Sequence, residues 1–229
     1  MLNEHRKELK FICNEMDFAN IQNRIKTVMK MDKNSNGEAY NIRSIYFDDR
    51  DNMCFRENEA GVDKRQKFRI RIYQKSDALI HAEIKSKYRD TTTKKSAVLS
   101  REQLDWILRE GKVPGEMCEN EVMKQYRMAI EAEGFRPVSI VEYERTAFVY
   151  PIGNVRVTFD RNIGASTQYD RFFMESLYSA PVLPVGKHIL EVKYDEFLPD
   201  YIAQLLEIGT LSRTSYSKYY FSRMITGRY

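Results

Sequence analysis

The chain has 229 residues, of which 42% are hydrophobic, 31% charged and 12% aromatic. This composition excludes an intrinsically disordered protein and a short disulfide scaffold, because enough apolar side chains are present to build a core. The net charge of +4 is too small to indicate nucleic-acid or membrane binding by itself. Glycine and proline number only 10 and 6, and no linker marks a boundary, so we expect one domain over residues 1–229.

The cysteines and the N-terminal residues indicate a cellular compartment. Cys13, Cys54 and Cys118 are odd in number and widely separated, so they form neither a disulfide framework nor a CxxC metal motif. The first residues are charged where a signal peptide is apolar, and no later apolar run reaches the roughly 20 residues that cross a bilayer. We therefore expect reduced thiols in a cytoplasmic protein without its own transmembrane segment, for which a membrane-protein partner is conceivable.

Helical periodicity recurs in five segments of the chain. After Asp17, apolar residues recur every three or four positions until the polar segment 33–37 interrupts them. Ser100 and Gln103 form a capping-box pattern, and Gly111 predicts the end of the helix that they begin. Three further helices are predicted over residues 119–133, 200–208 and 213–225, each followed by a glycine.

The remaining segments alternate polar and apolar residues with the period of two that is typical of β-strands. They cover residues 6–12, 40–48, 66–73, 79–87, 138–149, 155–163 and 188–195. Strands and helices do not alternate regularly along the chain. This order favours an α+β fold with a largely antiparallel sheet over a doubly wound parallel sheet.

Six of these strands place their charged residues on one face. In the segment 66–73, for example, Lys67, Arg69 and Arg71 share a face while the residues between them are apolar. The basic residues on these faces are Arg6, Lys10, Lys67, Arg69, Arg71, Lys85, Arg145, Arg156 and Lys193, and the acidic ones are Glu8, Glu83, Asp160 and Glu191. A solvated sheet face is the ordinary explanation for one such strand. Together the strands carry an excess of cations that indicates a bound polyanion.

Phosphate chains suit this face better than carboxylates or single anions. Arginine donates two parallel hydrogen bonds, and every phosphate unit offers several acceptor oxygens. Glu8 and Glu191 are candidate ligands of Mg²⁺ or Mn²⁺ shared with phosphate oxygens, and an ordinary cross-strand ion pair is the alternative for each. The sequence contains neither a GxxxxGK[ST] nor a GxGxxG motif. Side chains, and not a glycine-rich loop, would therefore bind the phosphates.

Seven short motifs follow one another in an order that is typical of one family. They are Arg6-x-Glu8-x-Lys10, Lys67-Phe-Arg-Ile-Arg71, Glu83-Ile-Lys85, Tyr143-Glu-Arg145, Val155-Arg-Val157, Glu191-Val-Lys193 and Ser215-Tyr-Ser217-Lys218-Tyr219. From about residue 4 to residue 225, the chain resembles the VTC domain, named for the vacuolar transporter chaperone complex, within the triphosphate tunnel metalloenzyme superfamily.

The resemblance implies an antiparallel β-barrel or tunnel with helices packed outside it and a basic interior that binds nucleoside triphosphate or polyphosphate. Members of the VTC branch make inorganic polyphosphate from ATP. The resemblance implies catalytic roles for Arg69, Arg71 and Lys218, and binding of Mn²⁺ or Mg²⁺ by Glu191 and Glu8. The substrate-binding residues that it implies are Lys10, Lys67, Lys85, Tyr143, Arg145, Arg156, Lys193 and Ser217.

One position departs from the superfamily pattern. Arg6 stands where the ExExK motif has its first glutamate, which favours the handling of phosphate chains and weakens the case for Glu8 as a direct metal ligand. Lys94 and Lys95 lie near a basic position of the family, but the sequence does not define their register.

We expect a monomeric, metal-dependent polyphosphate polymerase that transfers the γ-phosphate of ATP to a polyphosphate chain and releases ADP, without binding nucleic acid. A tripolyphosphate or nucleoside triphosphate hydrolase and a non-catalytic polyphosphate or nucleotide sensor are the alternatives.

Overall fold

The computed structural model describes residues 6–35, 38–89 and 91–227. They form two compact units. Unit 1 takes its described residues from 1–41, 143–163 and 181–217, and unit 2 from 42–142, 164–180 and 218–229. The single domain expected from the sequence stays a prediction.

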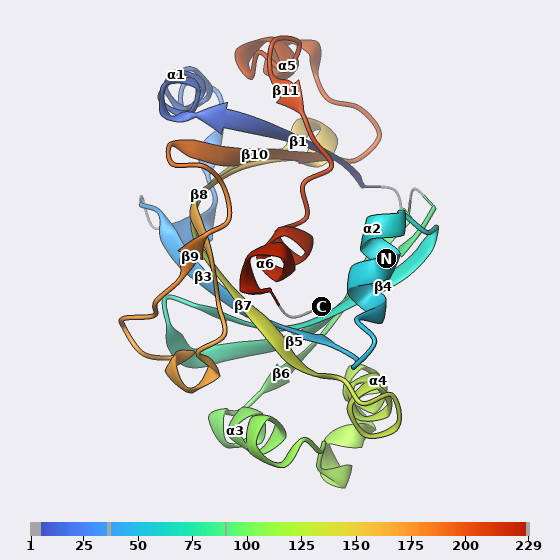
Figure 1. Cartoon of the computed structure of the whole chain (residues 1–229). Helices are drawn as coiled ribbons and strands as arrows, with labels where there is room; N and C mark the ends of the chain where they lie inside the picture. The colour runs from blue at the N-terminus through green and yellow to red at the C-terminus, as the bar shows by residue number, and fades with distance from the viewer. Residues whose placement is uncertain (1–5, 36–37, 90, 228–229) are drawn as a thin grey trace. The chain divides into compact units, whose positions relative to one another are not determined.

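Antiparallel strands make up the sheet in both units (Figure 1). The strands are β1 (Lys7–Asn14), β2 (Lys30–Met31), β3 (Tyr40–Asp48), β4 (Lys64–Tyr73), β5 (Ser76–Tyr88), β6 (Thr91–Leu99), β7 (Arg136–Tyr150), β8 (Val155–Ser166), β9 (Ala180–Pro181), β10 (Lys187–Tyr194) and β11 (Ser212–Arg213). Their order is β11-β1-β10-β8-β7 in unit 1 and β7-β3-β4-β5-β6 in unit 2, and β7 contributes to both. The α+β antiparallel prediction is confirmed, and the order of the described strands is open, with β11 and β6 at its ends.

The helices are short. They are α1 (Glu15–Ile25), α2 (Met53–Ala60), α3 (Arg101–Glu110), α4 (Glu121–Arg127), α5 (Asp200–Leu205) and α6 (Lys218–Thr226). The single turns are η1 (Lys33–Ser35), η2 (Gly115–Glu119), η4 (Ile152–Asn154) and η5 (Tyr169–Arg171), and η3 (Met128–Ala132) continues α4 as a π-helix. No helix in the described part of the chain has the length and apolar character needed to cross a membrane.

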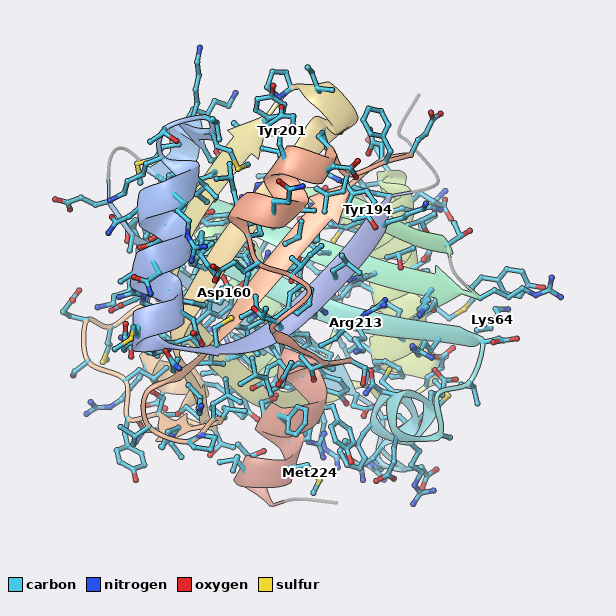
Figure 2. The ribbon with its side chains drawn as sticks, turned by 90° about the horizontal axis from the view of Figure 1, so that it is seen from above. Lys64, Asp160, Tyr194, Tyr201, Arg213 and Met224 are labelled. Atoms are coloured by element: carbon cyan, nitrogen blue, oxygen red, sulfur yellow. The ribbon has the colours of Figure 1, made fainter. Side chains whose placement is uncertain are left out.

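Several boundaries differ from those that the sequence predicts. The last helix begins at Lys218 and not at residue 213, because residues 212–213 form β11 beside β1, where Arg213 lies opposite Phe11 (Figure 2). The first helix begins at Glu15, since Asn14 and Asp17 form a capping box before it. Helix α2 and strand β6 are additional elements that the polar and apolar pattern did not indicate.

In unit 1 the core lies between two helices and one face of the sheet. Helices α1 and α5 lie beside β1 and β10 at the top of Figure 1. Phe159 of β8 is fully buried, and its ring lies 4.9 Å from that of Phe18 in α1. Phe11, Leu190 and Val192 of the neighbouring strands join this cluster. The charged residues of β1, β8 and β10 alternate with these apolar residues, so they occupy the opposite face.

Unit 2 repeats this arrangement with α4 on the apolar face of its strands. Phe68 of β4 contacts Tyr126 of α4 and Phe135, with ring centroids 5.3 and 5.1 Å apart. Ile70 beside it is fully buried. Helix α6 lies on the other face of the sheet, which carries the basic residues, because the Tyr219 ring lies 5.1 Å from that of Tyr46. The helices of this unit therefore do not all cover the apolar face.

A buried carboxylate anchors α6. The Tyr219 hydroxyl donates a hydrogen bond to Asp48 at the end of β3, and Asp48 also accepts from the backbone N–H groups of Cys54 and Phe55 in α2. Burial and the Asp48 charge both raise the pKa of Tyr219, so its phenol stays a donor. Arg223, which is 1% exposed, donates to Asn52 at 2.7 Å. These bonds place Lys218, the first residue of α6, next to the basic face of unit 2.

A buried arginine holds the irregular segment 167–179. Arg43 of β3 is 1% exposed, and its Nε donates to Glu142 at 2.9 Å. Its two terminal nitrogens donate to the carbonyl oxygens of residues 171, 172, 174 and 175. One guanidinium thus supplies donors to four backbone carbonyl groups, in addition to the turn hydrogen bonds that the segment makes within itself.

We predict that Arg43→Lys loosens this segment, because an ammonium lacks the planar set of donors that reaches four carbonyl groups. The expected loss in the free energy of unfolding is about 2 to 3 kcal/mol. Backbone amides of residues 169–175 should exchange hydrogen faster, as measured by mass spectrometry. The exposed Arg136→Lys is the control and should change stability by less than about 0.5 kcal/mol. Unchanged exchange in Arg43→Lys would show that the segment holds its conformation without this side chain.

Candidate functional site

The residues that the sequence singled out gather in two clusters, one in each unit. The unit 1 cluster comprises Glu8, Lys10, Tyr143, Arg145, Arg156, Asp160, Glu191 and Lys193. The unit 2 cluster comprises Lys67, Arg69, Arg71, Glu83, Lys85 and Lys94. Ser217 and Lys218 are half-buried and adjoin at the start of α6.

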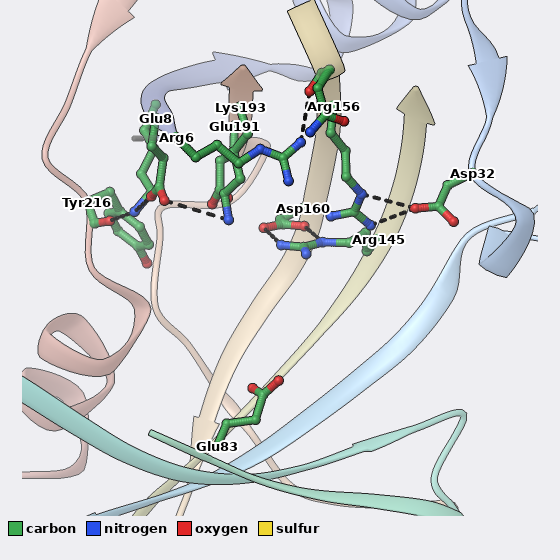
Figure 3. A network of polar contacts seen from close by, with 12 residues as sticks. Arg6, Glu8, Asp32, Glu83, Arg145, Arg156, Asp160, Glu191, Lys193 and Tyr216 are labelled. Carbon is green, nitrogen blue, oxygen red and sulfur yellow. Dashed lines mark hydrogen bonds and ion pairs between the residues drawn. The ribbon is translucent and has the colours of Figure 1, made fainter. Parts of the chain in front are cut away.

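Two glutamates and two lysines form a Glu–Lys quartet in the unit 1 cluster. In the register of β1 and β10, Glu8 lies opposite Lys193 and Lys10 lies opposite Glu191. The Lys10 Nζ lies 2.6 Å from Glu8 Oε1, and the Lys193 Nζ lies 2.7 Å from Glu191 Oε1 and 3.6 Å from Glu8 Oε2 (Figure 3). Lys10 also donates to the carbonyl oxygen of Tyr216 at 3.1 Å. Neighbours along and across the strands therefore carry opposite charges.

The two glutamates of the quartet keep Lys10 charged. Burial alone would lower the pKa of Lys10, but the carboxylates of Glu191 and Glu8 outweigh it and raise this pKa above its ordinary value. The Lys10 ammonium is therefore a cation at any physiological pH.

Two arginines of the unit 1 cluster are oriented by aspartates. Arg145 donates through Nε and Nη2 to the two carboxylate oxygens of Asp160, at 2.6 and 2.7 Å (Figure 3). Asp160 is fully buried, so this bidentate pair is shielded from water. Arg156 donates to one oxygen of Asp32, at 3.0 Å from Nε and 2.9 Å from Nη2, and to the Tyr40 hydroxyl at 3.3 Å. Each of these two arginines is therefore paired with the carboxylate of one aspartate.

The sequence did not indicate these aspartates as orienting residues. The alternation along β8 placed Asp160 on the correct face, but only the strand register pairs it with an arginine. Asp32 lies just after β2, a strand of two residues with no usable alternation. Tyr143 is buried, and the Arg145 guanidinium lies 5.2 Å from its ring centre, as its place in the motif suggested.

Glu83 is the centre of the unit 2 cluster. Its Oε2 accepts from Arg69 Nε at 2.7 Å, and its Oε1 accepts from Lys94 Nζ at 2.8 Å. Arg71 Nη1 lies 3.9 Å from Glu83 Oε2, and Arg71 Nε donates to Ser44 Oγ at 3.2 Å. Burial alone would raise the pKa of Glu83, but the surrounding cations outweigh it and hold this pKa well below its usual range. One ionised carboxylate therefore orients three cations.

A row of lysines crosses three strands of the same face. Lys67 of β4 lies opposite Lys85 of β5, which lies opposite Lys94 of β6. Lys95 lies opposite Ile84 and so belongs to the other face. The sequence did not define which of the two lysines lies on the basic face, and the strand register places Lys94 there. Like charges directly across a ladder repel, so this row favours a bound anion.

The two predicted metal ligands fit an ion that is bound together with phosphate. The described residues include no group of three or more His, Cys, Asp and Glu side chains able to hold a metal ion. Glu8 and Glu191 belong to adjacent strands and both contact Lys193. One or two carboxylates completed by phosphate oxygens are a common donor set for Mg²⁺, and Mn²⁺ prefers the same hard oxygen ligands. The residues present suit such a shared ion.

We predict that Glu83→Gln destabilises the protein by about 3 kcal/mol at neutral pH, because it leaves the largely buried Arg69 and Arg71 without their counter-charge. The folded pKa of Glu83 lies below its unfolded value of about 4.3, so its stabilisation is present above that pH and is lost as the pH falls toward the folded pKa. Urea unfolding at pH 7, 5, 4 and 3 should show the wild type and the variant converging at acidic pH.

The exposed Glu116→Gln is the matched control for this experiment and should unfold like the wild type at every pH. A Glu83→Gln variant as stable as the wild type at pH 7, or a difference that does not change with pH, would contradict the proposed role of the carboxylate.

Two solved structures superpose on this chain at low sequence identity. A Bacillus halodurans protein described as an adenylate cyclase superposes with a TM-score of 0.58 at 14% identity, over 95% of this chain and 96% of that one. A Pyrococcus horikoshii protein superposes with a TM-score of 0.47 at 14% identity, over 96% of this chain and 98% of that one. The first of these shows a common fold. No curated protein matches the sequence.

A family match extends over nearly the whole chain. The VTC domain matches residues 5–225, a range that contains both clusters and the Ser217–Lys218 pair. This match confirms the resemblance that the ordered motifs indicate, so the chain belongs to the VTC domain family.

Proposed function

We propose that the protein is a metal-dependent polyphosphate polymerase, which transfers the γ-phosphate of ATP to the end of a polyphosphate chain. The observation that carries the proposal is the charge of the unit 2 cluster. Its five cations, Lys67, Arg69, Arg71, Lys85 and Lys94, share one face of the sheet with the single carboxylate of Glu83. The excess positive charge lies on one face of an antiparallel sheet. A multiply charged anion balances it, and a phosphate chain supplies one negative charge or more per unit.

The fixed arginines suit phosphoryl transfer. In the proposed reaction an oxygen of the terminal phosphate of polyphosphate forms a bond to the γ-phosphorus of ATP. The bond from that phosphorus to the β,γ-bridging oxygen breaks, and ADP leaves with the electron pair. Charge on the equatorial oxygens is stabilised by positioned cations, which requires no protein nucleophile. Glu83 and Ser44 hold Arg69 and Arg71 in advance, so little side-chain freedom is lost when phosphate binds.

The other predicted residues take binding roles in this proposal. Lys218 contacts the transferred phosphate together with Arg69 and Arg71. Phosphate groups are also bound by Lys10, Lys67, Lys85, Tyr143, Arg145, Arg156, Lys193 and Ser217. A Mn²⁺ or Mg²⁺ ion held by Glu191 and Glu8 would neutralise charge on phosphate oxygens.

We predict that the purified protein, given ATP, Mn²⁺ and a short polyphosphate primer, makes long polyphosphate chains and a matching amount of ADP. The double variant Arg69→Ala/Arg71→Ala should lose at least about 100-fold in rate, because two donors to the transferred group are removed. Gel electrophoresis of the products, with ADP and orthophosphate assayed in parallel, measures both. Arg109→Ala, on the exposed surface of α3, is the control and should retain activity.

Two other outcomes would replace the proposal. Orthophosphate without chains would assign the protein as a hydrolase that uses water as the attacking group. Tight polyphosphate binding without turnover, lost in the double arginine variant, would assign it as a sensor.

A further inference from the structure

The unit 1 cluster differs from the unit 2 cluster in its charge balance. In the Glu–Lys quartet, two carboxylates are matched by two ammonium groups. Beside the quartet, Arg145 is matched by Asp160, and Arg156 is matched by Asp32. Once Asp32, the neighbouring partner of Arg156, is counted with this cluster, its four cations are matched by four carboxylates, whereas cations exceed carboxylates in the unit 2 cluster.

A balanced quartet opposes the binding of either ion alone. A divalent cation that approaches Glu8 and Glu191 meets the ammonium of Lys193, which lies 2.7 Å from one carboxylate and 3.6 Å from the other. A phosphate that approaches Lys10 and Lys193 meets the two carboxylates, which repel it. Either ion must also break an ion pair that is already formed, and the group released would lose its counter-charge.

Both ions together remove this conflict. Phosphate oxygens can replace the carboxylates as partners of Lys10 and Lys193, and the divalent cation can replace the ammonium groups as the partner of Glu8 and Glu191. The metal and the phosphate also bind each other directly. Every charge in the quartet then keeps an opposite neighbour.

We propose that the Glu–Lys quartet makes the binding of a divalent cation and of phosphate at unit 1 depend on each other, so that neither ion binds there tightly by itself. This inference rests on the proposed function, since it concerns the metal and phosphate of that same site. The dependence is reciprocal, because a phosphate that strengthens metal binding must be strengthened by the metal to the same degree. Without ligands, the lysines of the quartet balance the charge of the glutamates as the metal would. Its glutamates likewise balance the charge of the lysines as the phosphate would.

The first test removes the lysine charges and measures Mn²⁺ binding alone. In Lys10→Gln/Lys193→Gln the carboxylates no longer have ammonium partners, so Mn²⁺ without phosphate should bind between about 5-fold and 150-fold more tightly than in the wild type. Electron paramagnetic resonance of the free aqueous ion measures this binding. The single variant Lys193→Gln should show a smaller change in the same direction, and it serves if the double variant does not fold.

The second test removes the carboxylate charges and measures tripolyphosphate binding in the presence of EDTA. Glu8→Gln/Glu191→Gln should bind metal-free tripolyphosphate more tightly than the wild type by a similar factor, as measured by isothermal titration calorimetry. Lys187→Gln is the control in both tests, because Lys187 is exposed at the start of the same strand, β10. It should behave like the wild type.

Equal Mn²⁺ affinity in the wild type and the lysine variants would overturn the inference, as would equal metal-free tripolyphosphate affinity in the wild type and the glutamate variant. Both tests read binding and not turnover. If the affinities shift as expected but the protein makes no polyphosphate, the polymerase proposal is refuted and the mutual dependence stands. If the protein makes polyphosphate but the affinities do not shift, the mutual dependence is refuted and the polymerase proposal stands.

Discussion

Charged groups on a half-buried sheet face must each find an opposite charge, because removing an unpaired charge from water is far more costly than removing a pair. This constraint explains most contacts of the two clusters. The ionised Glu83 draws Arg69 and Lys94 to its two oxygens, and the fully buried Asp160 takes both donors of Arg145. Where a cluster supplies fewer carboxylates than cations, as in unit 2, the deficit becomes a binding preference for anions. Where the numbers are equal, as in the unit 1 cluster together with Asp32, the preference is for a neutral combination of ions.

The sequence predicted the faces of the strands well, because the alternation of side chains along a strand is a local property. Lys67, Arg69 and Arg71 share a face as the period of two requires, and the family match supports the ordered motifs that contain them. The antiparallel α+β class followed from the irregular order of strands and helices. These features depend only on neighbouring residues.

The pairing of charges across strands could not be predicted, because register depends on contacts between segments that lie far apart in the sequence. Lys94 lies opposite Lys85 only through the register of β5 and β6, and β6 itself is largely exposed and polar. For the same reason Asp32 showed no link to Arg156, which is 124 residues away in the chain. The start of α6 was placed too early because residues 212–213 make strand contacts with β1 that no helical periodicity records.

The anchoring of the segment 167–179 by Arg43 has a consequence for how this part of the chain can evolve. The hydrogen bonds that the guanidinium donates to this segment go to backbone carbonyl oxygens. Since every residue type offers the same carbonyl group, these hydrogen bonds do not depend on which side chains residues 171, 172, 174 and 175 carry. Relatives can therefore exchange the side chains at these positions and retain the same course of the backbone, provided that the arginine on β3 is kept.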